Sequence, residues 1–84
     1  MPHQETSYEA WQSIQEKLND KQRVVLWAFK SQGDMTDEEL AAFLGWPINR
    51  VTPRRGELVV KGLLRMAGTK ISSTGRRVII WGAA

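Results

Sequence analysis

The sequence predicts an α+β fold that is mostly α, with three to four helices followed by a C-terminal β-hairpin. Apolar residues recur at spacings of three and four along the first part of the chain, as in amphipathic helices. Residues that cap or end helices separate these stretches. The C-terminal part is rich in β-branched residues around a Ser-Thr-Gly turn. We expect a disordered tail over residues 1–6 and one domain over residues 7–84, because 84 residues suffice for one modest core.

The first helix is predicted to begin after Ser7 and to run to Leu18. Tyr8, Trp11 and Ile14 precede Leu18 at helical spacing, so these four side chains form one apolar stripe. Packing in the core is the default interpretation of such a stripe. It could also form a dimer surface or a site for another protein, and the sequence leaves these alternatives open.

The second helix is expected to begin with Asp20 as its cap and to end at Gly33. Its middle part, Val24–Phe29, is apolar on nearly every side, which predicts a central and buried helix. We therefore expect Trp27 to lie in the core, and Phe43 of the next helix as well. Core packing is favoured over the alternative that these rings stack on single-stranded bases.

Thr36 and Glu39 have the spacing of a capping box, which marks the start of a short third helix. The acidic side chains around them would lie in the first turn, where their negative charge interacts favourably with the positive end of the helix dipole. Capping thus accounts for the acidic cluster, and we assign no metal or acid–base site to it. Residues 40–44 supply the apolar face of this helix, and Gly45 is expected to end it.

A fourth helix follows, and Pro53 constrains where it begins. Proline inside a helix loses a hydrogen bond and clashes with the preceding turn, but it is well tolerated at the first position. We therefore predict a regular helix from Pro53 to Lys61, capped by Thr52 and preceded by a looser turn at 48–51. A kinked helix that starts at residue 48 or 49 is the alternative. Gly62 is expected to close the helix.

The remaining residues predict a β-hairpin. One strand is expected from Leu63 to about Ser72 and the other from Arg77 to Trp81, joined by a turn at residues 73–75. The second strand has the β-branched and aromatic content that strands favour. We expect Trp81 to pack the hairpin against the helices.

Charge is distributed unevenly along the chain, whose net charge is +3. Residues 1–44 hold four basic and eight acidic side chains, a net charge of −4. Residues 45–84 hold eight basic side chains and one acidic side chain, a net charge of +7. A basic end of this kind suits an anionic partner such as nucleic acid, although a soluble protein with uneven surface charge is the alternative.

The pattern of residues 40–47 (LAAFLGWP), followed by Val51, Leu58 and residues 61–64 (KGLL), resembles the winged helix-turn-helix family. In that family a short helix ends at a Leu-Gly pair, and the recognition helix ends at a Lys-Gly-Leu-Leu-like step into the wing. The resemblance covers about residues 20–82. It implies that the chain binds double-stranded DNA without a cofactor or a metal.

A narrower resemblance concerns small winged-helix proteins encoded by bacteriophages and prophages. Residues 48–55 (INRVTPRR) and 74–77 (TGRR) carry it. The two resemblances together imply a recognition segment at 48–61, a wing hairpin at 63–82 and a role as a small regulator of transcription or replication. A regulator that reads a palindromic site would also have to form a homodimer.

Several functional classes are disfavoured by composition. The sequence has no cysteine and one histidine, and it lacks a Gly-rich phosphate loop and a paired metal-ligand motif, so we do not expect an enzyme. No small-molecule substrate is evident. No stretch approaches the roughly 20 apolar residues that span a bilayer. We therefore expect a cytoplasmic protein that is held together by packing.

The resemblance implies that residues 48–55 enter the major groove, where a helix can place side chains on base edges. Arg50 and Arg54 are the first choices for base or phosphate contacts, because arginine can donate two parallel hydrogen bonds. Asn49 is either a reader of adenine or a turn residue. Basic residues of the wing are expected to contact phosphate. The full set of candidate DNA-contacting residues is Asn49, Arg50, Thr52, Arg54, Arg55, Lys70, Arg76 and Arg77.

Arg55 departs from the pattern of the family. On a regular helix it shares a face with Val51 and Leu58, where an apolar residue is usual. One explanation is that the break at the proline rotates this face. A second is a structural ion pair, with Glu39 or Glu57 as the candidate partner. A third is that the stem of the side chain lies on apolar surface while the guanidinium reaches water.

Two other functions stay open at this point. A winged helix can serve as a protein–protein interaction or assembly module, because a fold does not fix a function. It can also bind left-handed or single-stranded nucleic acid. The arginine-rich start of the fourth helix argues against a purely protein-binding role, although an acidic protein could meet the same surface.

Overall fold

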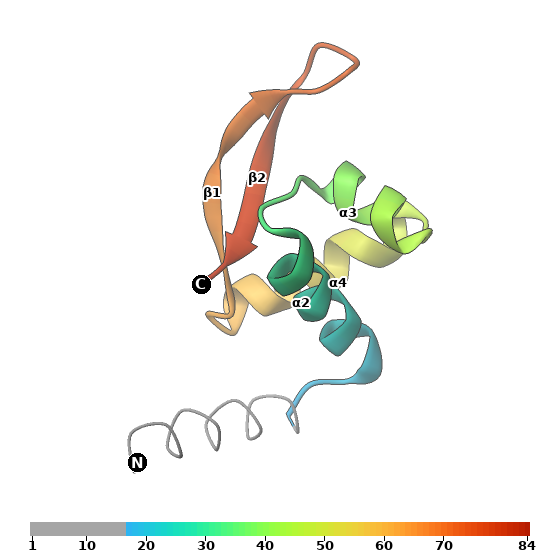
Figure 1. The fold of residues 1–84 in the computed structure, drawn as a ribbon, viewed down its shortest axis with the longest axis vertical. Coiled ribbons are helices and arrows are strands. Elements are labelled where there is room, and N and C mark those ends of the chain that lie inside the picture. Colours follow the sequence, from blue (N-terminus) through green and yellow to red (C-terminus); the bar gives the residue numbers. More distant parts are fainter. Residues whose placement is uncertain (1–16) are drawn as a thin grey trace.

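The computed structural model describes residues 17–84, which form three helices followed by a two-stranded antiparallel sheet (Figure 1). The elements are α2 (Asp20–Gln32), α3 (Asp37–Leu44), α4 (Ile48–Val60), β1 (Leu64–Ile71) and β2 (Arg77–Ala83). The tail predicted at residues 1–6 and the helix predicted from residue 7 lie outside the described residues, apart from residues 17 and 18, which form a turn where the helix was predicted to end.

α2 begins with a capping box that the sequence analysis missed. The Asn19 side chain accepts a hydrogen bond from the Gln22 backbone N–H at 2.8 Å, and the Gln22 side chain accepts one from the Asn19 N–H at 3.1 Å. The cap is therefore Asn19, and the prediction of Asp20 was wrong. The reciprocal pair satisfies two backbone donors at once, which a single capping side chain does not. Gly33 ends α2 as predicted, with φ at +86°.

α3 begins with the predicted capping box. The Glu39 backbone N–H donates to the Thr36 hydroxyl at 3.1 Å, and the Thr36 N–H donates to the Glu39 carboxylate at 2.9 Å. Gly45 ends the helix in the left-handed conformation, with φ at +68°. The short helix and its glycine turn lead directly into α4.

α4 begins at Ile48, with Pro47 at the capping position and Pro53 inside the helix. The prediction of a helix that starts at Pro53 with Thr52 as its cap was therefore wrong, and a start at residue 48 is correct. The Thr52 hydroxyl instead donates a hydrogen bond to the Asp37 carboxylate at 3.0 Å.

Packing explains why α4 includes its proline. A helix that starts at residue 48 places Val51 and Leu58 on one face, and both side chains are fully buried. Pro53 lies on the exposed side of the helix. The carbonyl that loses its hydrogen bond there belongs to Asn49, which is also exposed, so water can replace the missing donor.

β1 and β2 form the predicted hairpin, with Leu64 opposite Ala83 and Ile71 opposite Arg77. The register shifts between Met66 and Gly68, which marks a bulge. The turn lies at residues 73–75 as predicted. β2 extends two residues beyond its predicted end at residue 81.

The hairpin is tied to the helices along the second edge of β2. The Met35 N–H donates to the Trp81 carbonyl at 2.9 Å, and the Trp81 N–H donates to the Met35 carbonyl at 2.8 Å. Met35 immediately precedes the capping box of α3, so this pair fixes the base of the hairpin beside that helix. Trp81 thus joins the hairpin to the helical part, as the sequence predicted.

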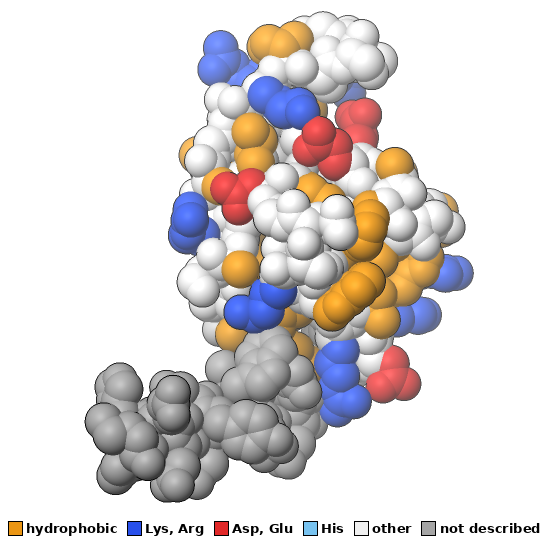
Figure 2. All heavy atoms as spheres, viewed as in Figure 1, with side chains coloured by type: hydrophobic (Ala, Val, Ile, Leu, Met, Phe, Trp, Pro, Cys, Tyr) orange, Lys and Arg blue, Asp and Glu red, His pale blue; other side chains and the backbone are white. Residues whose placement is uncertain are grey.

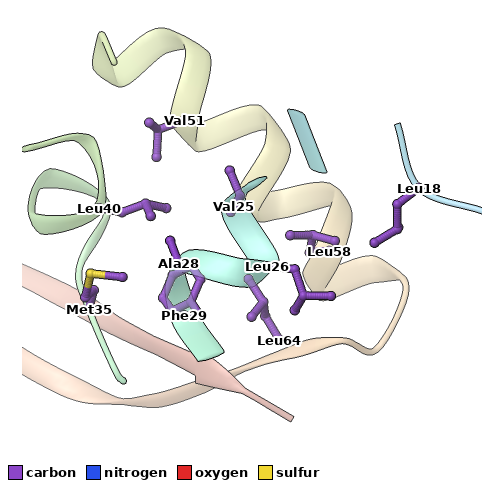
Figure 3. Close-up of a cluster of buried hydrophobic side chains, with 10 residues drawn as sticks. All are labelled: Leu18, Val25, Leu26, Ala28, Phe29, Met35, Leu40, Val51, Leu58 and Leu64. Carbon is purple, nitrogen blue, oxygen red and sulfur yellow. The ribbon is translucent and has the colours of Figure 1, made fainter. Parts of the chain in front are cut away.

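The core lies between the three helices and the base of the hairpin (Figure 3). Figure 3 shows side chains from α2, α3 and α4 that point toward one another. The buried apolar residues are Leu18, Val25, Leu26, Ala28, Phe29, Met35, Leu40, Val51, Leu58 and Leu64.

Trp27 and Phe43 do not lie in this core, which corrects the prediction for both. Their side chains are 56% and 41% exposed, and their ring centroids lie 5.8 Å apart. α2 turns Val25 and Phe29 inward, and Trp27, two residues from each, lies on the opposite side of the helix. The two exposed rings cover one another in part.

Leu58→Ala should destabilise the domain by about 2–5 kcal/mol, because it leaves a cavity among fully buried side chains. Val60→Ala is the matched control on the same helix, since Val60 is 89% exposed, and it should change the stability by less than about 0.5 kcal/mol. Urea unfolding followed by circular dichroism measures both. Equal effects of the two substitutions would contradict the observed packing of α4.

Candidate nucleic-acid interface

Arg55 and Asp37 form an ion pair with two hydrogen bonds. The Arg55 Nε donates to one carboxylate oxygen of Asp37 at 2.9 Å, and Nη2 donates to the other at 2.8 Å. The guanidinium carbon also lies 4.2 Å from the ring centroid of Trp81. The two charged side chains are 15% and 20% exposed. This cluster joins α4, α3 and β2.

The partner of Arg55 is therefore Asp37, and the prediction of Glu39 or Glu57 was wrong. A helix that begins at residue 48 directs position 55 toward the start of α3, where Asp37 is the first helical residue. Arginine suits the site because its planar group can form two hydrogen bonds and stack on a ring at the same time, which lysine cannot. This explains an arginine on the inward face of α4.

Arg54 is also engaged within the chain. Its Nη2 donates to the Glu57 carboxylate at 3.0 Å, and the other oxygen of that carboxylate accepts from the Gln22 amide at 2.8 Å. The hydrogen bond from Gln22 and the charge of Arg54 lower the pKa of Glu57. Arg54 thereby belongs to a network between α4 and α2.

Lys70 pairs with Glu39 across the space between β1 and α3. The Lys70 Nζ donates to the Glu39 carboxylate at 2.7 Å, and both side chains are 45% exposed. The hydrogen bond from Lys70 lowers the pKa of Glu39, and the backbone N–H of Thr36 lowers it further. This ion pair links the wing to the first turn of α3.

The remaining candidates are exposed, although Arg77 lines the same pocket as Asp37 and Arg55. Asn49 and Arg50 lie in the first turn of α4, and Arg76 and Arg77 lie where the hairpin turn enters β2. The Arg50 guanidinium lies 5.7 Å from the ring centroid of Trp46. Within residues 17–84, none of these three arginines forms an ion pair with a carboxylate.

The eight predicted residues thus divide into two sets. The internally bonded set is Thr52, Arg54, Arg55 and Lys70. The open set is Asn49, Arg50, Arg76 and Arg77. Figure 2 shows basic side chains over the hairpin and at the edge of the molecule where Figure 1 places the turn between α3 and α4. Sequence reasoning missed most of this division, because the partners of three of the bonded residues lie on another element.

Two further findings concern other kinds of site. In the described part of the chain, no three acidic or histidine side chains gather so that they could hold a metal ion. Asp37 and Glu39 from the acidic cluster are instead used for the ion pairs and for capping. None of the helices within residues 17–84 is long and apolar enough to cross a membrane.

Solved structures with a similar fold include two bacterial regulators. NMB1585, a MarR family regulator from Neisseria meningitidis, matches 94% of this chain with a TM-score of 0.62 and 18% sequence identity. The adhesin competence repressor AdcR from Streptococcus pyogenes matches 98% of this chain with a TM-score of 0.60 and 18% identity. The chain spans 53% and 58% of those two chains. No protein-family model and no curated protein sequence matches it.

The likeness to these structures confirms the predicted fold. The domain is a winged helix-turn-helix, in which α3 and α4 form the helix-turn-helix and β1 and β2 form the wing. At 18% identity, the comparison concerns the fold and carries no functional residue from one chain to another.

Arg55→Ala should destabilise the domain by about 1–3 kcal/mol, because it removes two charge-assisted hydrogen bonds and leaves Asp37 partly buried without its partner. Asp37→Asn should have a smaller effect in the Arg55→Ala background than in the wild type. The coupling free energy from this double-mutant cycle should be about 0.5–3 kcal/mol in urea unfolding. Arg50→Ala is the control for loss of a positive charge on α4. A coupling of zero would contradict the structural role of Arg55.

Acid should weaken the link between the wing and α3. Because the pKa of Glu39 lies below its usual value of 4.5 in the folded state, the ionised carboxylate stabilises the fold above that pH. This contribution is lost as the pH falls through the lowered pKa. Glu39→Gln keeps a capping side chain but loses the charge, so its melting temperature should fall less steeply between about pH 5 and pH 3 than that of the wild type.

Lys70→Met is the second variant for this test, since it removes the largest cause of the lowered pKa. As in Glu39→Gln, the melting temperature of this variant should fall less steeply with decreasing pH than that of the wild type. If the melting temperature of both variants fell with pH as steeply as that of the wild type, the pair of Lys70 and Glu39 would not contribute to stability.

Proposed function

We propose that this chain binds double-stranded DNA and acts as a small regulator of transcription or replication. The observation that carries the proposal is the open set of basic residues at two places of one winged helix-turn-helix. Arg50 lies at the start of α4, and Arg76 and Arg77 lie at the turn of the wing. Helix α4 would enter the major groove, and the wing would contact the phosphate backbone beside it.

The start of α4 supports this role in a second way. α2 and α3 each begin with a capping box, whereas the capping position of α4 is Pro47, which provides no side-chain hydrogen bond. The Arg50 N–H donates to the Pro47 carbonyl at 3.0 Å, so the donors without a capping side chain are the N–H groups of Ile48 and Asn49, and the helix dipole adds positive potential there. Both properties favour a phosphate of the DNA backbone.

The two sets of residues receive different roles in this proposal. Arg50, Arg76 and Arg77 contact phosphates, and Asn49 contacts a base. Arg54, Arg55, Lys70 and Thr52 hold α4 and the wing in position through their bonds within the chain. This assignment reduces the eight residues expected from the sequence to four direct contacts.

The regulatory part of the proposal is supported by the similar structures. One of them is described as a MarR family regulator and the other as a repressor. A palindromic DNA site would require two copies of this chain. The proposed origin from a phage or prophage depends on the sequence resemblance of residues 48–55 and 74–77.

Protein binding is the second candidate function, and one observation favours it. Trp27 and Phe43 form an exposed aromatic pair on α2 and α3. Exposed apolar patches often mark sites of protein contact. None of the four proposed DNA-contacting residues lies on these two helices, so both functions are compatible with one molecule.

Titration with fluorescent duplex DNA of mixed sequence tests the proposal. Binding should weaken steeply between about 50 mM and about 200 mM salt, because phosphate contacts release counterions. Arg50→Ala and Arg76→Ala should each weaken binding and lower the salt slope by about one. Lys21→Ala, in the first turn of α2, is the control with the same charge loss and should change binding little. If the folded wild type does not bind duplex DNA at low salt, the proposal fails and protein binding becomes the leading function.

A further inference from the structure

We propose that the exposed face of α4 selects A·T base pairs, which it reads through Asn49 and the apolar surface that follows it. The proposal rests on the DNA binding proposed above and names the bases that this helix recognises.

The exposed face of α4 follows from its inward face. Val51 and Leu58 are fully buried, and Arg55 between them is held by Asp37. Positions on the opposite side of a helix with 3.6 residues per turn form a row at spacings of four, three and four. We call this row the outer ridge, and its residues are Asn49, Pro53, Gly56 and Val60.

The outer ridge is open to a ligand along its length. Asn49 and Pro53 are exposed, and Val60 is 89% exposed. Gly56 is half-buried, and a side chain added there would meet nothing within 4 Å beyond the nearby backbone of its own helix. The absence of a side chain at Gly56 also lets another molecule approach the helix backbone closely.

The chemistry of the outer ridge matches the major-groove edge of an A·T pair. The asparagine amide can donate to N7 and accept from the N6 amino group of adenine. The proline ring and the valine side chain can contact the methyl group of thymine. Guanine is usually read by arginine or lysine, and the outer ridge has neither.

The cations of α4 are directed elsewhere. Arg54 is bonded to Glu57, and Arg55 is bonded to Asp37. Arg50 stands on a flank of the helix with its guanidinium over Trp46, which suits a phosphate at the edge of the groove. In this proposal Arg50 is the arginine of α4 that adds affinity, and its phosphate contact carries no preference for guanine.

Glu57 is the acidic side chain on the flank of the outer ridge, and a carboxylate can accept a hydrogen bond from the amino group of cytosine. Both of its oxygens already accept bonds, one from Gln22 and the other from Arg54. Reading of cytosine by Glu57 would require these bonds to break. The free polar group on the ridge is therefore the amide of Asn49.

Two residues of the ridge oppose helix formation, which points to selection for another purpose. Proline removes a backbone donor inside a helix, and glycine increases the entropy lost on folding. Pro53 is exposed and Gly56 has open space around it, so neither residue is required by the core. Residues that break a local rule at exposed positions are candidates for function. A smooth and uncharged surface that fits against thymine methyl groups provides such a function.

The test compares alternating poly(dA-dT) with alternating poly(dG-dC) as competitors for the bound fluorescent duplex. The wild type should prefer poly(dA-dT) by about tenfold at equal phosphate concentration. Asn49→Ala should reduce this preference by about fivefold or more and should leave competition by poly(dG-dC) unchanged. Arg50→Ala is the matched control and should weaken binding to both polymers equally. Thermal melts by circular dichroism establish that the variants fold.

Two modified polymers separate base reading from DNA shape, because A·T sequences also differ in the width of the minor groove. Replacement of adenine by 7-deazaadenine removes the N7 acceptor, and replacement of thymine by uracil removes the methyl group. Both changes affect the major groove, and each should weaken binding by the wild type. The loss caused by 7-deazaadenine should disappear in Asn49→Ala.

The outcomes distinguish the two proposals. Equal competition by the two unmodified polymers, or a preference for poly(dG-dC), would overturn A·T selection while DNA binding stands. A preference for poly(dA-dT) that Asn49→Ala and both modified polymers leave unchanged would also overturn reading by the outer ridge. Absence of binding to any duplex by the folded protein would remove the proposed function together with this inference.

Discussion

The hydrogen bonds to the Asp37 carboxylate are the interaction on which the relative placement of α3, α4 and the wing depends. This carboxylate accepts two hydrogen bonds from Arg55 and one from Thr52, so α4 is bonded twice to the first turn of α3. Arg55 also lies against the ring of Trp81, whose backbone pairs with Met35 just before α3. The Asp37 carboxylate and its partner Arg55 thus connect both helices of the helix-turn-helix with the base of the wing. Because this cluster is mostly shielded from water, its hydrogen bonds are stronger than those of an exposed ion pair.

This use of charge limits what the basic half of the chain can offer to a partner. Residues 45–84 have a net charge of +7, yet Arg54, Arg55 and Lys70 are neutralised by carboxylates of the same chain. Position therefore matters more than total charge in the proposed interface. Two of these pairs bond α4 and β1 to the first turn of α3. In the proposed interface, the arginines at the start of α4 and at the hairpin turn are left to contact DNA. Because Arg54 and Arg55 of α4 are bonded within the chain, the proposed selection of base pairs depends on the neutral side chains of this helix.

α4 combines opposite requirements on its two sides. Its inner side buries Val51 and Leu58 in the shared core, and this burial stabilises the helix. Its outer side includes Pro53 and Gly56, each of which disfavours a helix. The helix persists because tertiary packing outweighs intrinsic propensity, while the carbonyl freed by the proline belongs to an exposed residue that water can reach. The outer surface is thus free to have a composition that suits a ligand instead of the fold.

The sequence by itself determined the fold class, the element order, the capping box of α3, the glycine ends of α2 and α3 and the hairpin turn. These features depend on local spacing and on backbone preferences, which a single sequence contains. Only the tertiary structure decided the start of α4, the exposure of Trp27 and Phe43, and the partner of Arg55. The first depended on the burial of Val51, which outweighed the cost of an internal proline. The others depended on which side of each helix meets a neighbour and on contacts between residues far apart in the chain. These are properties of packing, which local patterns do not contain.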